Sequence, residues 1–355
     1  MLKRKVVCFF TILALGITGC SSFGSNNADS SDADEYQAVM PYNTSDTRVK
    51  HVGLISDQNT RVQIEDGLMD LSKQYFSPNQ VKYKTHAFLD YDTLDATDGS
   101  RGLLGTLRDD NPNGLNPGSE EEFNTGNGKV KGAILLADIY ELDWYKGKDL
   151  KGISIALVVN GTVGEHNTKV KKAKMRNYLK VTSTKLVNYM RSRYNEITDS
   201  IPIYVASYQL SASEDDNLGG YIYSLYLNKN DQDFENLSEH WYRVPSNEIA
   251  KKDPTLSDQF LAYQNKVAKV LADNTYCIAQ AKYDGDTLEK LNITITAHGK
   301  TSGEMLAVSQ VAKKQLSKFK SVDCEYSVKV IDNEETYCMM KRNKNETVVN
   351  SVTSF

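Results

Sequence analysis

The chain has 355 residues and a formal net charge of −4, with 40% hydrophobic and 25% charged residues. This length predicts about two domains of roughly 150 residues each, and the composition is ordinary for a globular protein. The mildly acidic balance excludes a general nucleic-acid binder, which needs a dominant basic field.

The N-terminal segment has the composition of a secretory signal. Three basic residues in positions 1–5 precede an apolar run over residues 6–17. An apolar run of this length is usual for a signal peptide and too short to span a hydrocarbon core of about 30 Å. We therefore predict a signal peptide over residues 1–19; the alternative is a short anchor that stays on the protein.

The end of this segment is similar to a bacterial lipobox, with Ile17, Thr18 and Gly19 directly before Cys20. In a lipobox the cysteine thiol forms a thioether with a diacylglycerol, and a peptidase then cuts before the cysteine. Small residues at the preceding positions let the backbone enter the peptidase cleft. Two acyl chains anchor a protein stably where one chain is marginal. We expect an extracytoplasmic protein that is anchored to the cell membrane through diacylglycerol on Cys20.

A flexible tether is predicted over residues 20–48. Residues 21–35 are mostly Ser, Asn, Asp and Gly, with almost nothing to bury. Such a composition favours an extended, flexible chain over a packed core. The tether would hold the folded part of the protein away from the membrane.

Two later regions have the same pattern of predicted elements. Residues 133–161 and 277–299 each read as a strand, a polar turn and a second strand with alternating apolar residues. An amphipathic helix follows each pair, and its apolar stripes are Met175, Leu179, Leu186 and Met190 in the first copy and Met305, Val308, Val311 and Leu316 in the second. The remaining predicted elements are helices over 61–76 and 257–273 and strands over 201–210, 220–228, 324–332 and 335–342.

This pattern predicts an α+β fold of two tandem α-β-β-α-β-β repeats with mainly antiparallel sheets. The predicted parts are a first repeat domain over 49–233, a connector over 234–254, a second repeat domain over 255–345 and a tail over 346–355. The first repeat contains an insertion over about 77–131 that is rich in Gly, Asp and Asn. A loop of that length without secondary structure is usually functional or disordered.

Several segments together resemble the CamS family of bacterial lipoproteins, described as sex-pheromone precursors. Besides the leader, they are "EDGLMDLSKQYF" (65–76), "GLNP" (114–117), "LKGISIALVVN" (150–160) and "IPIYVASYQLSA" (201–212). The resemblance implies that a short hydrophobic peptide, here residues 13–19, is released from the signal sequence and acts on a peptide receptor of another cell. It also implies a non-enzymatic surface protein whose two-repeat ectodomain binds an unknown extracellular or cell-wall partner.

A run of basic residues is the first candidate for such binding. Residues 169–194 carry nine basic side chains and no acidic one. Five of them are candidate contacts to anionic lipid or cell-wall polymer: Lys169, Lys171, Lys172, Lys174 and Arg176. The alternative is a solvated face that nearby acidic residues balance.

Tyrosines in the paired strands are the second candidate, because a tyrosine ring on a sheet face can stack on sugars or hold extended peptides. The candidate ligand face consists of Tyr204, Tyr208, Tyr221, Tyr223 and Tyr226. The alternative is that these rings pack at the edge of the core while their hydroxyls reach water.

No metal site or cofactor is predicted, because the five histidines are scattered and no cysteines form a CxxC pair. Cys277, Cys324 and Cys338 allow one disulfide and a spare thiol, but three partly buried thiols are the favoured interpretation. An alternative function is an extracytoplasmic enzyme acting on cell-envelope material, with carboxylates of the insertion as acid and base.

Overall fold

The computed structural model describes residues 35–51, 54–95, 102–211, 217–229, 231–270 and 275–354. The predicted signal peptide and the first half of the predicted tether lie outside these residues. Of the helices in the described part, none has the length and apolar character needed to cross a membrane.

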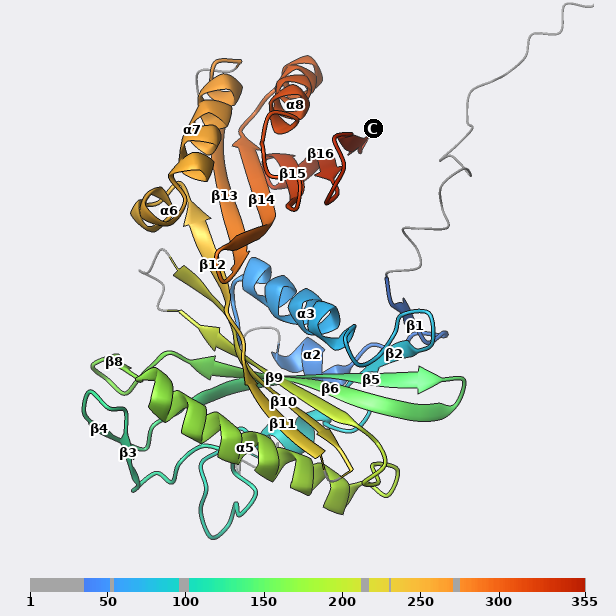
Figure 1. Cartoon of the computed structure of the whole chain (residues 1–355), viewed down its shortest axis with the longest axis vertical. Helices are drawn as coiled ribbons and strands as arrows, with labels where there is room; N and C mark the ends of the chain where they lie inside the picture. The colour runs from blue at the N-terminus through green and yellow to red at the C-terminus, as the bar shows by residue number, and fades with distance from the viewer. Residues whose placement is uncertain are drawn as a thin grey trace, which may run out of the picture.

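One 13-stranded sheet runs through both halves of the described chain (Figure 1). From one edge to the other, its strands are β1 (Gln37–Ala38), β2 (Lys82–Thr85), β5 (Leu136–Lys146), β6 (Asp149–Asn160), β9 (Ile203–Leu210), β10 (Asn217–Asn228), β12 (Glu239–Val244), β13 (Thr275–Asp284), β14 (Thr287–Ala297), β15 (Glu325–Asp332), β16 (Glu335–Arg342) and β17 (Asn350–Thr353). A further strand, β11 (Asp231–Asn236), pairs with β10. Two small hairpins lie outside the sheet: β3 (Glu122–Asn124) with β4 (Lys129–Lys131), and β7 (Thr162–Val163) with β8 (Thr168–Lys169).

The sheet is mostly antiparallel, which confirms the predicted mixture of helices with mainly antiparallel strands. Three pairs of described strands are parallel: β1 with β2, β6 with β9, and β14 with β15. The two predicted repeat domains contribute to this one sheet, because β12 pairs with both β10 and β13 and so joins the two halves.

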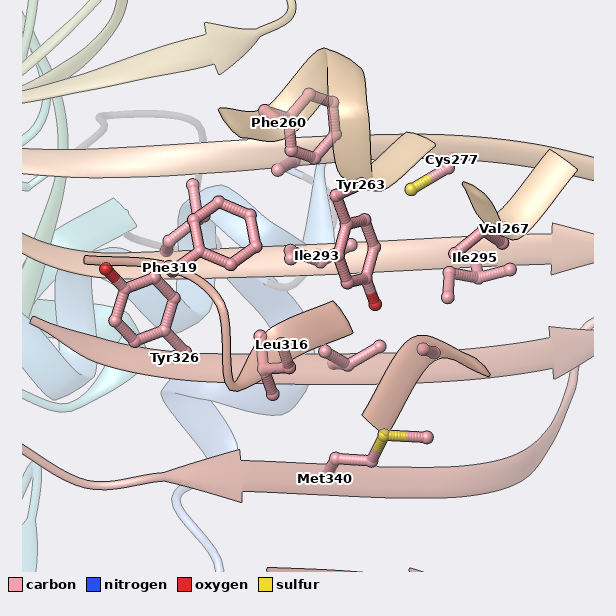
Figure 2. Close-up of a cluster of buried hydrophobic side chains, with 14 of the residues drawn as sticks. Phe260, Tyr263, Val267, Cys277, Ile293, Ile295, Leu316, Phe319, Tyr326 and Met340 are labelled. Atoms are coloured by element: carbon pink, nitrogen blue, oxygen red, sulfur yellow. The ribbon is translucent and has the colours of Figure 1, made fainter. Parts of the chain in front are cut away.

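The helices are arranged differently in the two halves. In the first half, α3 (Gln58–Ser72) and α5 (Lys172–Arg193) pack on opposite sides of the sheet (Figure 1). In the second half, α7 (Pro254–Ala268) and α8 (Ser302–Leu316) share one core on the same side (Figure 2). The helices that open the two predicted repeats are therefore not placed equivalently.

Local sequence fixes where these helices begin. Asp57 accepts a hydrogen bond from the backbone N–H of Thr60 at the start of α3, and Asp253 caps α7 directly before Pro254. Thr301 and Glu304 form a reciprocal capping box at the start of α8. These caps satisfy backbone donors that would otherwise lack partners at a helix N-terminus.

The predicted insertion contributes to the core. It contains β2, α4 (Tyr91–Asp95), β3 and β4, and its buried leucines pack on the same side of the sheet as α5. They include Leu89, Leu94, Leu103, Leu104 and Leu115. Asn116 is also buried; its amide donates to two carbonyls and accepts from two backbone N–H groups. The described part of this insertion is therefore folded.

Other segments predicted as linkers are also folded. The last described residues of the tether include β1 and α2 (Asp46–His51), and the connector contains β12 and α6 (Asn247–Lys252). The tail contributes β17. The prediction of three thiols is confirmed, because Cys277, Cys324 and Cys338 are free and buried.

Candidate functional site

The predicted lipidation site lies outside the described residues. This applies to Cys20 and to the lipobox residues Ile17, Thr18 and Gly19. They remain predictions from the sequence.

The predicted tyrosine ligand face is wrong for at least four of its five members. Tyr204, Tyr208 and Tyr221 are completely buried, and Tyr223 is 8% exposed. The first three pack in the core under α3, where the Tyr208 hydroxyl donates to Gln63 at 3.0 Å. Rings that α3 and the sheet enclose cannot stack on a ligand. The half-buried Tyr226 stacks on Tyr75, with ring centroids 3.8 Å apart.

The predicted basic residues lie together on the surface. Lys169 ends β8, Lys171 is the N-cap of α5, and the other three occupy the first turns of the helix. Four of the five are exposed, and Lys174 is half-buried. The apolar stripe of α5 faces the core and contains Met175, Leu179, Leu186, Val187 and Met190. We call Lys169, Lys171, Lys172, Lys174 and Arg176 the basic face.

The basic face carries unbalanced positive charge. Within the described residues, its five side chains form no ion pair with a carboxylate. The first turn of α5 contains no acidic residue. Cations at this end are unfavourable because the helix dipole is positive there. The Arg176 guanidinium lies 5.4 Å from the centre of the Phe234 ring, in a cation–π contact.

A cluster of buried charges on β5 was missed from the sequence. Asp138 is fully buried and accepts two hydrogen bonds from Arg48, at 2.9 and 3.1 Å. His51 Nδ1 lies 3.3 Å from the same carboxylate. Burial alone would raise the pKa of Asp138, but the hydrogen bonds from His51 and Arg48 and the guanidinium charge hold it below its usual range. This ion pair ties α2 to the sheet.

Two more buried acids follow on the same strand and hold a turn. Glu141 accepts hydrogen bonds from the backbone N–H groups of Phe88 and Leu89, at 3.0 and 2.7 Å. Asp143 accepts one from Ala87 at 2.9 Å. Burial raises the pKa of both carboxyls, that of Asp143 to about 6, and each also interacts with the other. These acids anchor the turn between β2 and α4.

This arrangement does not match the predicted enzyme alternative. That alternative placed the acid and base on the insertion, whereas the buried carboxylates that the structure brings together come from β5. Among the described residues, no three His, Cys, Asp or Glu side chains are placed to hold a metal ion. The carboxylates of the cluster bind backbone and side-chain groups of the fold.

Comparison with known proteins gives one family. The family model for the CamS sex pheromone cAM373 precursor matches residues 42–347. No protein of curated function matches the chain in sequence.

Two solved structures are similar in fold. One is the sex pheromone precursor from Lactobacillus salivarius subsp. salivarius UCC118, with a TM-score of 0.77 and 19% identity over 91% of this chain and 97% of that one. The other is the C-terminal domain of the sex pheromone staph-cAM373 precursor from Staphylococcus aureus. Its TM-score is 0.70, with 19% identity over 85% of this chain and 98% of that one.

Proposed function

The chain belongs to the CamS sex pheromone precursor family, and from this we propose that it is a surface lipoprotein anchored to the cell membrane through Cys20. The order of the segments in the leader supports this proposal: basic residues come first, then an apolar run, and then a lipobox directly before Cys20. Cleavage before Cys20 leaves residues 13–19 at the end of the leader, where a released peptide would carry the pheromone activity. Its partner would be a peptide receptor on another cell.

The ectodomain would be built from two related units. Both halves contain four strands whose successive pairings are antiparallel, parallel and antiparallel: β5, β6, β9 and β10 in the first half, and β13, β14, β15 and β16 in the second. A helix links the parallel strands in each half, α5 in one and α8 in the other. This shared order supports a tandem repeat of the strands and the linking helix. The different placement of α3 and α7 limits the repeat to those elements.

We further propose that the basic face contacts an anionic surface, such as lipid headgroups or a cell-wall polymer. The observation that carries this proposal is a group of cations at the positive end of α5, without ion pairs to carboxylates of the described residues. Such an arrangement costs stability in the free protein. An anionic surface would offset that cost by about 1 kcal/mol for each Lys or Arg close to it.

Charge reversal at Lys172, Lys174 and Arg176 tests this proposal. The mature chain from residue 20, made without lipid, is mixed with vesicles of phosphatidylcholine and phosphatidylglycerol, and the bound fraction is measured by flotation. We expect the Lys172→Glu, Lys174→Glu, Arg176→Glu variant to bind on the order of 100-fold more weakly, because three favourable contacts become repulsive. Added salt should weaken wild-type binding.

The matched control reverses three exposed lysines at the end of α8 and after it: Lys314, Lys318 and Lys320. It has the same net charge as the test variant, so it should keep most of the binding if the basic face acts locally. Equal loss in both variants would show that only net charge matters. Unchanged binding of the test variant would remove the basic face as the contact.

A further inference from the structure

A pocket of about 490 Å³ opens beside α3, on the opposite side of the sheet from the basic face. Its size lies within the range of about 300–1,000 Å³ that is usual for small-molecule sites. Rings of Tyr42, Tyr83 and Tyr140 line it, together with aliphatic side chains of α3. Arg48, Glu65, His86 and Glu141 also line it. The Glu141 carboxylate is already used by the backbone N–H groups of Phe88 and Leu89. A mostly apolar wall with a few polar groups is the usual composition of a binding pocket.

His86 lines this pocket and carries a buried hydrogen-bond acceptor that no described residue uses. Its side chain is 1% exposed, and Nδ1 lies 2.9 Å from the carbonyl oxygen of Leu89. A carbonyl only accepts, so Nδ1 carries the proton and Nε2 presents a lone pair. Burial, with the nearby Arg48 charge, lowers the pKa of His86 to about 3 and keeps the ring neutral. Nε2 has no hydrogen-bond partner among the described residues.

Two further groups in the pocket have unused hydrogen-bonding capacity. The terminal nitrogens of Arg48 are committed to Asp138 and the carbonyl of Ile139, but its buried Nε has no partner in the described part of the chain. The exposed Glu65 carboxylate accepts no hydrogen bond from a described residue, although the charges of Arg48 and Arg61 act on it. Besides the hydroxyls of its serine, threonine and tyrosine side chains, the described pocket wall therefore contains one unpaired donor, in Arg48, and two unpaired acceptors, in His86 and Glu65.

We propose that this pocket binds a pyranose sugar. A pyranose has a flat apolar face of C–H groups that packs against aromatic rings, and hydroxyls at its edge that both donate and accept. Its hydroxyls can donate to His86 and Glu65 and accept from Arg48, which gives a partner to each of these three groups. A simple anion lacks the donors that Nε2 requires, and Asp138 already neutralises the one cation. An amine would lie close to the Arg48 charge.

Three compounds of different chemistry separate this proposal from its alternatives. Saturation-transfer NMR on the mature chain compares N-acetylglucosamine with phenol, which has a flat face but one hydroxyl, and with glycerol, which has hydroxyls but no flat face. We expect signals from the sugar and none from the other two at equal concentration. If N,N′-diacetylchitobiose binds more tightly than N-acetylglucosamine, the natural ligand is a glycan chain. If the two bind equally tightly, the natural ligand is a free sugar. Both results support the proposal.

Two variants locate the binding in this pocket. His86→Asn removes the Nε2 acceptor and keeps a residue type that tolerates the positive φ of 47° at this position. Tyr42→Ala removes an exposed wall of the pocket. Each should raise the Kd for the sugar about tenfold, which equals about 1.4 kcal/mol. Tyr276→Ala, at an exposed tyrosine of the second half, should leave the Kd within about twofold.

Circular dichroism melting would verify that each variant is folded before its Kd is compared. The proposal is overturned if no sugar signal appears, if phenol binds and the sugars do not, or if both folded variants bind like the wild type. These results are independent of vesicle binding, because the basic face lies on the other side of the sheet.

Discussion

Replacing Asp138 by Ala is expected to lower the free energy of unfolding by about 3–5 kcal/mol. The Asp138 carboxylate is fully buried and accepts two hydrogen bonds from Arg48, whose side chain is 17% exposed. Its removal leaves a largely desolvated guanidinium without a counter-charge and His51 without its carboxylate partner. Urea unfolding followed by circular dichroism measures the loss.

The matched control is Asp149→Ala at the start of β6. Asp149 is 75% exposed and pairs with Lys151 at 3.3 Å, and exposed pairs of this kind contribute about 0–1 kcal/mol. A loss at Asp138 no greater than the loss at Asp149 would show that the buried pair does not hold α2 to the sheet.

Replacing Asp143 by Asn is expected to stabilise the protein at pH 7, by about 1–3 kcal/mol. Burial disfavours a charged carboxylate here and raises the pKa of Asp143 to about 6, although hydrogen bonds with Glu141 and the Ala87 N–H act in the opposite direction. An asparagine keeps an oxygen to accept the Ala87 N–H at this position, and it carries no charge. Its amide can also donate to Glu141.

The pH dependence of this effect follows from the raised pKa. Between about pH 4 and pH 6, the folded state binds a proton at Asp143 that the unfolded state releases, so the wild type gains stability as the pH falls. The advantage of the Asn variant should therefore be largest at pH 7 and shrink towards pH 4. Urea midpoints of both proteins at the two pH values measure it, and other titrating groups cancel in the difference.

Asp138→Asn is the control for this second prediction, because it should lower stability at pH 7. The pKa of Asp138 is held below its usual range, so its ionised form is the one that stabilises the fold. A loss of stability in Asp143→Asn, or a gain of the same size at every pH, would contradict the account of this pair.

The sequence predicted best those elements whose side chains follow a clear period. The strands expected over 201–210 and 324–332 are observed as β9 and β15, and the stripe from Met175 to Met190 faces the core from α5. One side of each of these segments is buried. Apolar residues therefore recur along the sequence with the spacing of a strand or a helix.

The apolar spacing could not predict which strands pair with each other or which side chains another element covers. β12 has few residues and an interrupted apolar pattern, so its role in joining two halves of one sheet depends on pairing partners distant in sequence. Several leucines of the insertion, such as Leu103 and Leu115, lie in irregular loops, where no period marks them as buried. The tyrosines alternate as an amphipathic strand would, and nothing local indicated that α3 covers them.

Some of the candidate sites could be recognised from the sequence, and others could not. The basic face was visible as a run of like charge and lies at the surface. The acids of β5 are recognisable in the sequence, because Asp138, Glu141 and Asp143 interrupt an apolar strand. Charges in such a strand need specific partners. The sugar pocket could not be found, because Tyr42, Glu65, His86 and Tyr140 come from four separate segments.

The central claim is that the protein is processed and anchored at Cys20, and mass spectrometry of the mature N-terminus tests it most directly. The account predicts a protein that begins at Cys20 with diacylglycerol on the thiol, and a free peptide ending at Gly19 in the medium. A mature protein that keeps the intact leader from Met1, or that carries an unmodified Cys20, would contradict it.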